Sequence, residues 1–320
     1  MHGHHHAHDA TRAFAWVTLL NLAYTAVEAG YGFATGSLAL LSDALHNAGD
    51  VLGLGLAWAA AVLAQRAPTA RHTYGWRRAT LLAPLANAVV LVGFSGALGW
   101  EALRRFAAPP QVPGATVMVV AAIGIAVNLG AAWLVRDGHA HDLNRRAAFL
   151  HLVADAAVSL AAVLAGAGIH WLGWEWLDPA TALLVALVVA AGSFGLLRDA
   201  FEAAMDAVPR HLDRGEVERW LLAQPGVRQA HHLHIWSLGT GEIALTAHLV
   251  REDAGDHDAF LDRLADELDA RFGINHPTIQ IERGGDCAHD CAQRAPHGRA
   301  HAHAHAHAHP HPHAGGPHRH

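Results

Sequence analysis

Long apolar stretches alternate with short polar segments over the first two thirds of the chain. Six of these stretches are long enough to cross a bilayer, because a helix that spans the hydrocarbon core needs about 20 mainly apolar residues. They lie at residues 13–33, 38–64, 79–103, 115–135, 147–169 and 177–197. The pattern predicts an all-α membrane domain of six transmembrane helices within residues 13–208, preceded by a histidine-rich tail at residues 1–12.

After residue 208 the apolar positions follow shorter periods, as in a small soluble α+β domain. Asp213 followed three positions later by Glu216 is typical of a helix N-terminus. A strand, a strand, a helix and a strand are then expected at residues 227–238, 242–250, 257–272 and 278–282. This order predicts an αββαβ, metallochaperone-like domain at residues 209–284, and a domain of this size gains stability by pairing with a second copy.

Arginine residues gather on one side of the predicted spans and set the expected orientation. Loops on the cytoplasmic side of a membrane carry an excess of Lys and Arg. The residues that follow the second, fourth and sixth spans are Arg66, Arg71, Arg77, Arg78, Arg136, Arg145, Arg146 and Arg198. Arg104 and Arg105 oppose them but are outnumbered. We therefore expect a multi-pass protein of the inner (plasma) membrane, with both termini and the α+β domain in the cytoplasm.

Histidine is the unusual feature of the composition, with 29 copies against 22 Lys and Arg. Most of the excess lies at the two ends, and histidine-rich tracts of this kind bind metals and stay disordered. The C-terminal tail, residues 285–320, also contains Cys287 and Cys291, whose thiolates suit zinc or cadmium. A reducing cytosol favours metal ligation over a disulfide, and free thiols in a loop are the alternative. The formal charge of -6 without a basic stripe argues against nucleic acid as a partner.

Ionisable residues inside two of the predicted spans are the strongest functional signal, because charge is costly within the hydrocarbon. The second span contains His46 and Asp50, and the fifth contains His151 and Asp155. Each His precedes its Asp by four positions, so each pair lies on one helix face, one turn apart. Two such helices packed face to face offer two imidazoles and two carboxylates to one point. That is a tetrahedral ligand set suited to zinc.

A polar link between packed helices is the alternative interpretation of a single His-x-x-x-Asp pair. The same spacing in two separate spans favours a metal site over two unrelated links. Asp43 lies one turn before His46, where it could line the water path or cap the helix start after Ser42.

Several motifs are similar to those of one family of membrane transporters. Residues 36–47 (GSLALLSDALHN) with Asp50, and residues 151–155 (HLVAD), resemble motifs of the cation diffusion facilitators, specifically of their zinc-type branch. The similarity covers nearly the whole chain and includes residues 71–78 (RHTYGWRR) and 232–238 (HLHIWSL). The chain thus resembles a transporter and not an enzyme.

The resemblance implies a homodimeric zinc/proton antiporter that exports Zn²⁺ from the cytoplasm by alternating access. Its transport site would be formed by His46, Asp50, His151 and Asp155. In this family an Asp in place of the first His widens selectivity towards cadmium, so His46 favours zinc. Metal binding needs neutral imidazoles and ionised carboxylates, so protons and zinc compete for the same lone pairs and a proton gradient can drive export.

The resemblance also implies zinc sites outside the membrane. The candidate ligands in the cytoplasmic domain are His231, His248, His276, Glu282, Cys287 and Cys291. Some relatives have a further site in the loop after the second span, with an acidic residue and two His. Here only His72 is present and Trp76 occupies the other His position, so we expect that site to be weak or absent.

The residues alone leave several other functions open. Ser95 between Gly93 and Gly96 is similar to the glycine-flanked serine of an intramembrane protease, with His151 as its base. A metal sensor or storage protein could use the terminal His tracts, but it would have no use for ligands at mid-membrane depth. A passive channel is also possible, because ligands do not reveal coupling. The ligand types leave the choice among zinc, cadmium, cobalt, nickel and iron open.

Overall fold

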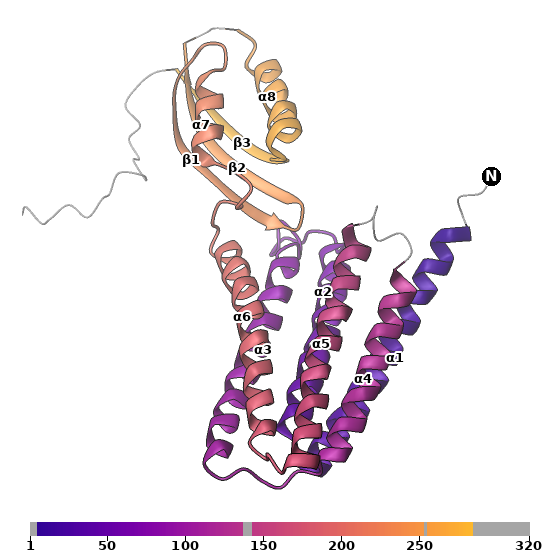
Figure 1. Cartoon of the computed structure of the whole chain (residues 1–320). Helices are drawn as coiled ribbons and strands as arrows, with labels where there is room; N and C mark the ends of the chain where they lie inside the picture. The colour runs from indigo at the N-terminus through magenta and orange to yellow at the C-terminus, as the bar shows by residue number, and fades with distance from the viewer. Residues whose placement is uncertain (1–4, 137–142, 253–254, 284–320) are drawn as a thin grey trace, which may run out of the picture.

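The computed structural model describes residues 5–136, 143–252 and 255–283, and within them a helical bundle carries a small α+β domain at one end (Figure 1). The bundle consists of α1 (His5–Thr35), α2 (Leu38–Ala64), α3 (Ala79–Ala107), α4 (Gly114–Val135), α5 (Leu143–Leu172) and α6 (Leu177–Ala204). Within the described ranges, the five helices α2 to α6 are long and apolar enough to cross a membrane. The chain is therefore a membrane protein with a helical transmembrane domain.

Helix bounds follow local signals where those signals exist. The α2 helix begins at Leu38 and ends at Ala64, as expected, because the Ser37 side chain accepts a hydrogen bond from the Leu40 backbone N–H and caps its start. The α1 helix begins at His5, whereas the apolar pattern predicted a start at residue 13. A helix satisfies its own backbone hydrogen bonds, so it can continue past the apolar stretch into polar residues.

Large apolar side chains cover the outside of the bundle, as expected of a surface that faces lipid. The most exposed of them include Leu54, Trp58, Trp100, Trp133, Leu164 and Leu187. Small residues occupy the contacts between helices instead. A Cβ on Gly166 of α5 would lie 2.7 Å from the Met118 backbone nitrogen and 2.8 Å from the Gly114 carbonyl oxygen of α4. These two helices can pack closely because the side chain is absent there.

The α+β domain has the predicted order of elements. It consists of α7 (Arg214–Leu222), β1 (Val227–Gly239), β2 (Glu242–Arg251), α8 (His257–Phe272) and β3 (His276–Glu282). The strand order is β1-β2-β3, with β1 and β2 antiparallel and β2 and β3 parallel. Parallel strands need a crossover, and α8 supplies it. The core between the sheet and the helices contains Val217, Leu221, Leu245, Leu249, Phe260, Leu264 and Leu268.

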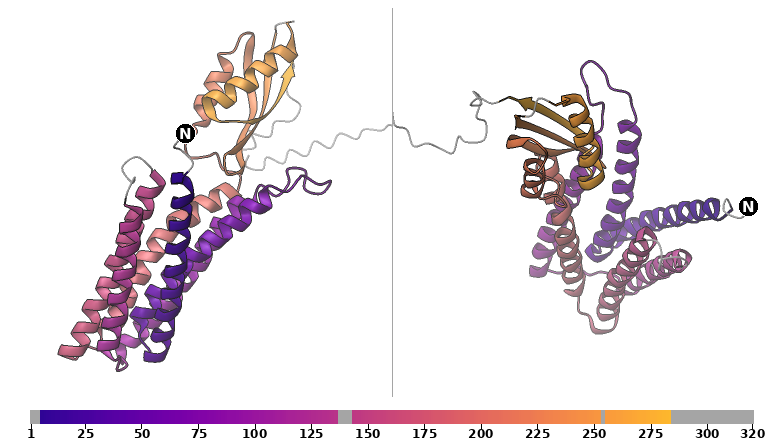
Figure 2. Two further views of the ribbon diagram at one scale, coloured as in Figure 1. Left: turned by 90° about the vertical axis from the view of Figure 1, so that its right-hand side faces the viewer. Right: turned by 90° about the horizontal axis from the view of Figure 1, so that it is seen from above.

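The β1–β2 turn rests on the loop that joins α2 and α3, and this contact positions the α+β domain on the bundle (Figure 2, left). An Arg77 guanidinium nitrogen donates to a Glu242 carboxylate oxygen at 2.6 Å, and the Thr240 backbone N–H donates to the Thr80 hydroxyl at 3.0 Å. Arg78, at the start of α3, also pairs with Asp206 after α6 at 2.6 Å.

Candidate metal centres

The four predicted intramembrane ligands lie together between α2 and α5. The His46 Nε2 atom is 3.3 Å from the Asp155 Oδ1 atom, and the His151 Nε2 atom is 3.2 Å from the Asp50 Oδ2 atom. Within the helices, His151 Nε2 lies 3.6 Å from Asp155 Oδ2 and His46 Nδ1 lies 4.0 Å from Asp50 Oδ2. Each His thus faces a carboxylate on its own helix and one on the other helix.

Several of the atoms that would bind a metal are buried and free of hydrogen bonds, whereas the His151 side chain is 47% exposed. One ligand atom each from His46, Asp50 and Asp155 can be chosen so that all lie within 4.8 Å of one another. Both Asp155 oxygens, Asp50 Oδ2 and His46 Nδ1 are buried without a hydrogen bond. Unpaired buried carboxylate oxygens are expensive, and a cation at their centre would satisfy them. The donor set of imidazole nitrogen and carboxylate oxygen fits Zn²⁺ as a transported substrate.

Asp43 does not cap a helix, which corrects one of the two roles expected for it. The α2 helix begins five residues earlier, and Asp43 is completely buried within it. The Ser159 hydroxyl of α5 donates to Asp43 Oδ2 at 2.7 Å. This bond is a second polar link between α2 and α5, and no pattern in the sequence pointed to Ser159. A serine in an apolar helix gives no signal of its own, because small polar residues are common at helix contacts.

The start of α2 is fixed by Asp178, which the sequence analysis also missed. Asp178 of α6 is completely buried, and its carboxylate accepts bonds from the Ser37 hydroxyl at 2.5 Å, the Leu38 N–H at 2.8 Å and the Ala39 N–H at 3.2 Å. A carboxylate at a helix N-terminus satisfies free N–H groups and interacts favourably with the helix dipole. Asp178 therefore holds the helix that carries His46 and Asp50 at one end.

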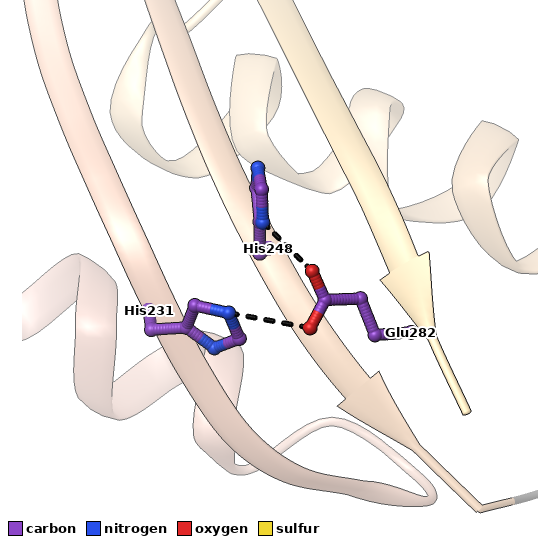
Figure 3. Close-up of side chains that lie close together, drawn as sticks. All are labelled: His231, His248 and Glu282. Atoms are coloured by element: carbon purple, nitrogen blue, oxygen red, sulfur yellow. Dashed lines mark hydrogen bonds and ion pairs between the residues drawn. The ribbon is translucent and has the colours of Figure 1, made fainter. Parts of the chain in front are cut away.

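A second cluster lies on the sheet of the α+β domain (Figure 3). Glu282 at the end of β3 accepts from His248 Nδ1 of β2 at 2.8 Å and lies 3.3 Å from His231 Nε2 of β1. His231 and His248 are paired across the antiparallel strands, which places both rings beside the same carboxylate. The ligand atoms of all three residues lie within 4.8 Å of one another, a spacing that suits a metal ion.

A bulge in β1 brings a further ring to this cluster. The register of β1 shifts between His231 and His234, and His232 has a φ of 51°. An extra residue in one strand of a pair re-aims its neighbours. The His232 ring consequently lies 4.9 Å from the His248 ring and 5.3 Å from the His231 ring, measured between centroids. The sequence shows adjacent histidines but not the bulge that turns both towards one point.

Other predicted ligands lie elsewhere. His276 is at the opposite end of β3 from Glu282, where its Nε2 atom is 3.1 Å from an Arg77 nitrogen, so the structure does not bring it to the cluster. Cys287 and Cys291 lie outside the described residues, as does the tail at residues 285–320. His72 stacks on Trp76 at 4.4 Å and contacts Thr69, and it joins neither group of potential ligands found in the described part of the chain.

The serine considered as a nucleophile is not placed for that role. Ser95 of α3 is buried and lines a small cavity with His46, between α2, α3 and α6. Across the described ranges no hydrogen bond joins Ser95 to His151 or to another histidine. Small side chains at a helix contact account for this segment more simply than a catalytic pair does.

A helical membrane domain with His and Asp between two of its helices, joined to an α+β domain with a group of candidate metal ligands, fits a metal transporter. Family models for the cation efflux transmembrane domain and for the cation efflux protein cytoplasmic domain match residues 15–203 and 209–284. The chain belongs to the cation efflux family, the cation diffusion facilitators, whose members transport zinc, cadmium or cobalt. This confirms the family expected from the motifs, and with it a transporter and not an enzyme.

Its relatives are bacterial transporters of similar length. The zinc transporter ZitB of Escherichia coli (strain K12) is 36% identical over 298 residues, which cover 89% of this chain and 95% of that protein. The cadmium, cobalt and zinc/H(+)-K(+) antiporter of Bacillus subtilis (strain 168) is 34% identical over 286 residues, 88% of this chain and 92% of that one. A solved metal-bound C-terminal domain of the CzcD transporter is 43% identical, covers 22% of this chain and 99% of that chain, and superposes with a TM-score of 0.21.

Proposed function

We propose that this protein exports divalent transition metal from the cytoplasm in exchange for protons, with Zn²⁺ as its main substrate. The transport site is formed by His46, Asp50, His151 and Asp155. The observation that carries the proposal is the cross-pairing of two imidazoles and two carboxylates between α2 and α5, with buried oxygens that have no other partner. The relatives named as zinc transporters and as a zinc/H(+)-K(+) antiporter support the substrate and the coupling.

Exchange follows from the charge of the four side chains. Two carboxylates carry two negative charges, which one Zn²⁺ bound to neutral imidazoles neutralises. Two protons on the imidazoles neutralise them equally well, so zinc and two protons are electrostatic alternatives at this site. Histidine changes charge near neutral pH, which allows the site to load zinc on the side with fewer protons and release it on the other.

The membrane arrangement that fits this function has six spans, with both termini in the cytoplasm of an inner (plasma) membrane. The α1 helix is the sixth span, because it packs along α2 and α4 in the bundle (Figure 2). Residues 13–208 then form the transport domain and residues 209–284 a cytoplasmic domain through which two copies pair. The arginines between the spans support this orientation.

His231, His248 and Glu282 bind metal in the cytoplasmic domain and sense or hold it there. A ligand set of two imidazoles and one carboxylate leaves a fourth position for another residue or for water. His232 is the nearest further donor, and Cys287 and Cys291 follow in the chain. A stable metal site in this domain would rigidify the sheet at the end that lies away from the β1–β2 turn.

The experiment that tests the transport site uses purified protein in liposomes with a pH indicator inside. Zinc-dependent proton flux and zinc uptake are measured with and without an imposed pH gradient, for wild type, Asp50→Ala, Asp155→Ala and Glu101→Gln. Glu101 is a matched control, because it is paired with Arg104 and Arg105 far from the site. Both site variants are expected to lose zinc-dependent flux while Glu101→Gln keeps it. Normal zinc-dependent flux in either site variant would refute the proposed transport site. Zinc uptake that does not depend on the pH gradient would refute the coupling to protons.

A further inference from the structure

Two further carboxyl groups are buried beside the transport site. Glu28 of α1 and Asp43 of α2 are both completely buried, and both lie beside Asn47, which donates to Glu28 and follows Asp43 by one helical turn. Neutral groups hold the pair in place. The Tyr24 hydroxyl donates to Glu28 Oε1 at 2.8 Å, the Ser159 hydroxyl donates to Asp43 Oδ2 at 2.7 Å, and the Asn47 amide donates to Glu28 Oε2 at 3.5 Å.

No cation neutralises these two carboxyls within the described residues. No Arg or Lys contacts either of them, and the other titratable groups that act on the pair are Tyr24 on α1, His46 on α2 and Asp155 on α5. His46 has its ring nitrogens directed at Asp155 and Asp50. Asp43 Oδ1 is buried and has no hydrogen-bond partner. Two ionised carboxylates without a counter-charge in the membrane interior carry a desolvation penalty of several kcal/mol each, so they cannot both be ionised.

We propose that Glu28 and Asp43 form a proton-binding site that is separate from the four metal ligands. One proton is shared between the two carboxyls, on Asp43 Oδ1 or on Glu28 Oε2, which are the oxygens without a short donor. Like charges held at one place share a proton in this way. A metal cation fits less well, because only Asp43 Oδ1 and Asn47 Oδ1 among the described oxygens of these residues are without a hydrogen-bond partner, whereas hard cations take six or more oxygen ligands.

The consequence for transport rests on the proposed function, whereas the protonation itself does not. Asp43 lies one turn from His46 along α2. When the pair loses its proton, an extra negative charge appears beside the metal site and holds zinc more strongly. When the pair is protonated, zinc is held less strongly. The pair thus adds one proton to those that compete directly for the ligands, and the pH dependence of zinc affinity becomes steeper.

Infrared spectroscopy of the full-length protein tests the protonation directly. A protonated carboxylic acid has a C=O stretch that is distinct from the bands of a carboxylate and shifts in D₂O. The wild-type protein should keep such a band at neutral pH. The double variant Glu28→Gln/Asp43→Asn should lose it, and each single variant should shift its frequency, since the remaining carboxyl loses the partner with which it shares the proton. Glu101→Gln, which removes a carboxyl paired with arginines, should leave the band unchanged.

Zinc affinity measured by calorimetry between pH 6 and pH 8 tests the consequence. The slope of log Kd against pH should be smaller in Glu28→Gln than in wild type by up to about one, or tenfold in Kd per pH unit. A wild-type protein without a carboxylic acid band, or a band that stays unchanged in the double variant, overturns the proposal. Should a variant fail to fold, the wild-type spectrum in H₂O and D₂O decides alone. A normal band together with normal transport in Asp155→Ala would instead refute only the proposed function.

Discussion

Replacing Asp178 by Ala should strongly destabilise the bundle, because the Asp178 carboxylate fixes the start of α2. The Asp178 carboxylate accepts three hydrogen bonds from residues 37–39 and has no exposed surface. Removing it leaves the Ser37 hydroxyl and two backbone N–H groups buried without an acceptor. The effect also reaches the metal site, because α2 carries His46 and Asp50 and loses the contact that fixes its start.

The size of the effect can be estimated from these contacts. A hydrogen bond to a charged group contributes about 1.5–3 kcal/mol, and bonds that share one acceptor are not additive. Removing one partner of a buried charged network costs about 3–5 kcal/mol, so we expect Asp178→Ala to lower the free energy of unfolding by about that amount. Asp178→Asn should cost about 1–3 kcal/mol, because the amide keeps an acceptor but turns an NH₂ group towards one of the donors.

Unfolding in mixed detergent micelles, followed by tryptophan fluorescence and circular dichroism, measures these differences. Asp199→Ala is the matched control, since Asp199 lies on the same helix, is half exposed and pairs with Arg210. An exposed ion pair of this kind contributes less than about 1 kcal/mol. If Asp178→Ala unfolded at the same denaturant concentration as Asp199→Ala, the buried carboxylate could not be what holds the start of α2.

Three further outcomes are expected. Gly166→Val should lower the melting temperature by several degrees, because its Cβ would meet the backbone of α4. Gly192 has open space around it, so Gly192→Ala should be neutral or stabilising. A thermal scan compares the melting temperatures of the two variants. His248→Ala should remove one metal ion per chain from the metal content measured by mass spectrometry, and an unchanged content would exclude the cytoplasmic site. Arg77→Ala should leave the unfolding free energy within about 1 kcal/mol of wild type, because its pair with Glu242 is one-third exposed, but should broaden the distance between spin labels on the two domains.

Local sequence signals, such as apolar periodicity and capping residues, predicted the helices and strands well. The αββαβ order was found from periodicity, and the helix from His257 to Phe272 has the bounds that the sequence indicated. Asp213 caps α7, as its position before Glu216 predicted. The spacing of four between His and Asp also predicted correctly that each pair lies on one helix face, because a helix fixes the relative direction of residues one turn apart.

Contacts between distant segments could not be found in this way. The contact of Glu28 with Asn47 joins α1 and α2, and a single Glu in a long apolar stretch gives only the general signal of a buried charge. His276 shows the reverse case. The resemblance to the zinc-type branch of the family placed it among the ligands, but six positions along a strand separate it from Glu282 by about 20 Å. Neither the contact of Glu28 nor the position of His276 can be predicted from the sequence without knowing the packing of the helices and the register of the strands.

The location of the four ligands relative to the helix contacts bears on how the site could open. The α5 helix packs mainly along α4, and α3 packs mainly along α6, whereas α2 touches α5 at few points. His46, Asp50, His151 and Asp155 lie at that lightly packed contact, so the two helices can separate without exposing a large apolar core. Zinc or protons bound between the pairs would hold the contact together, and their departure would leave two facing carboxylates that repel. At the proposed transport site, a change of bound cation would therefore act on a contact between α2 and α5 that contains little apolar packing.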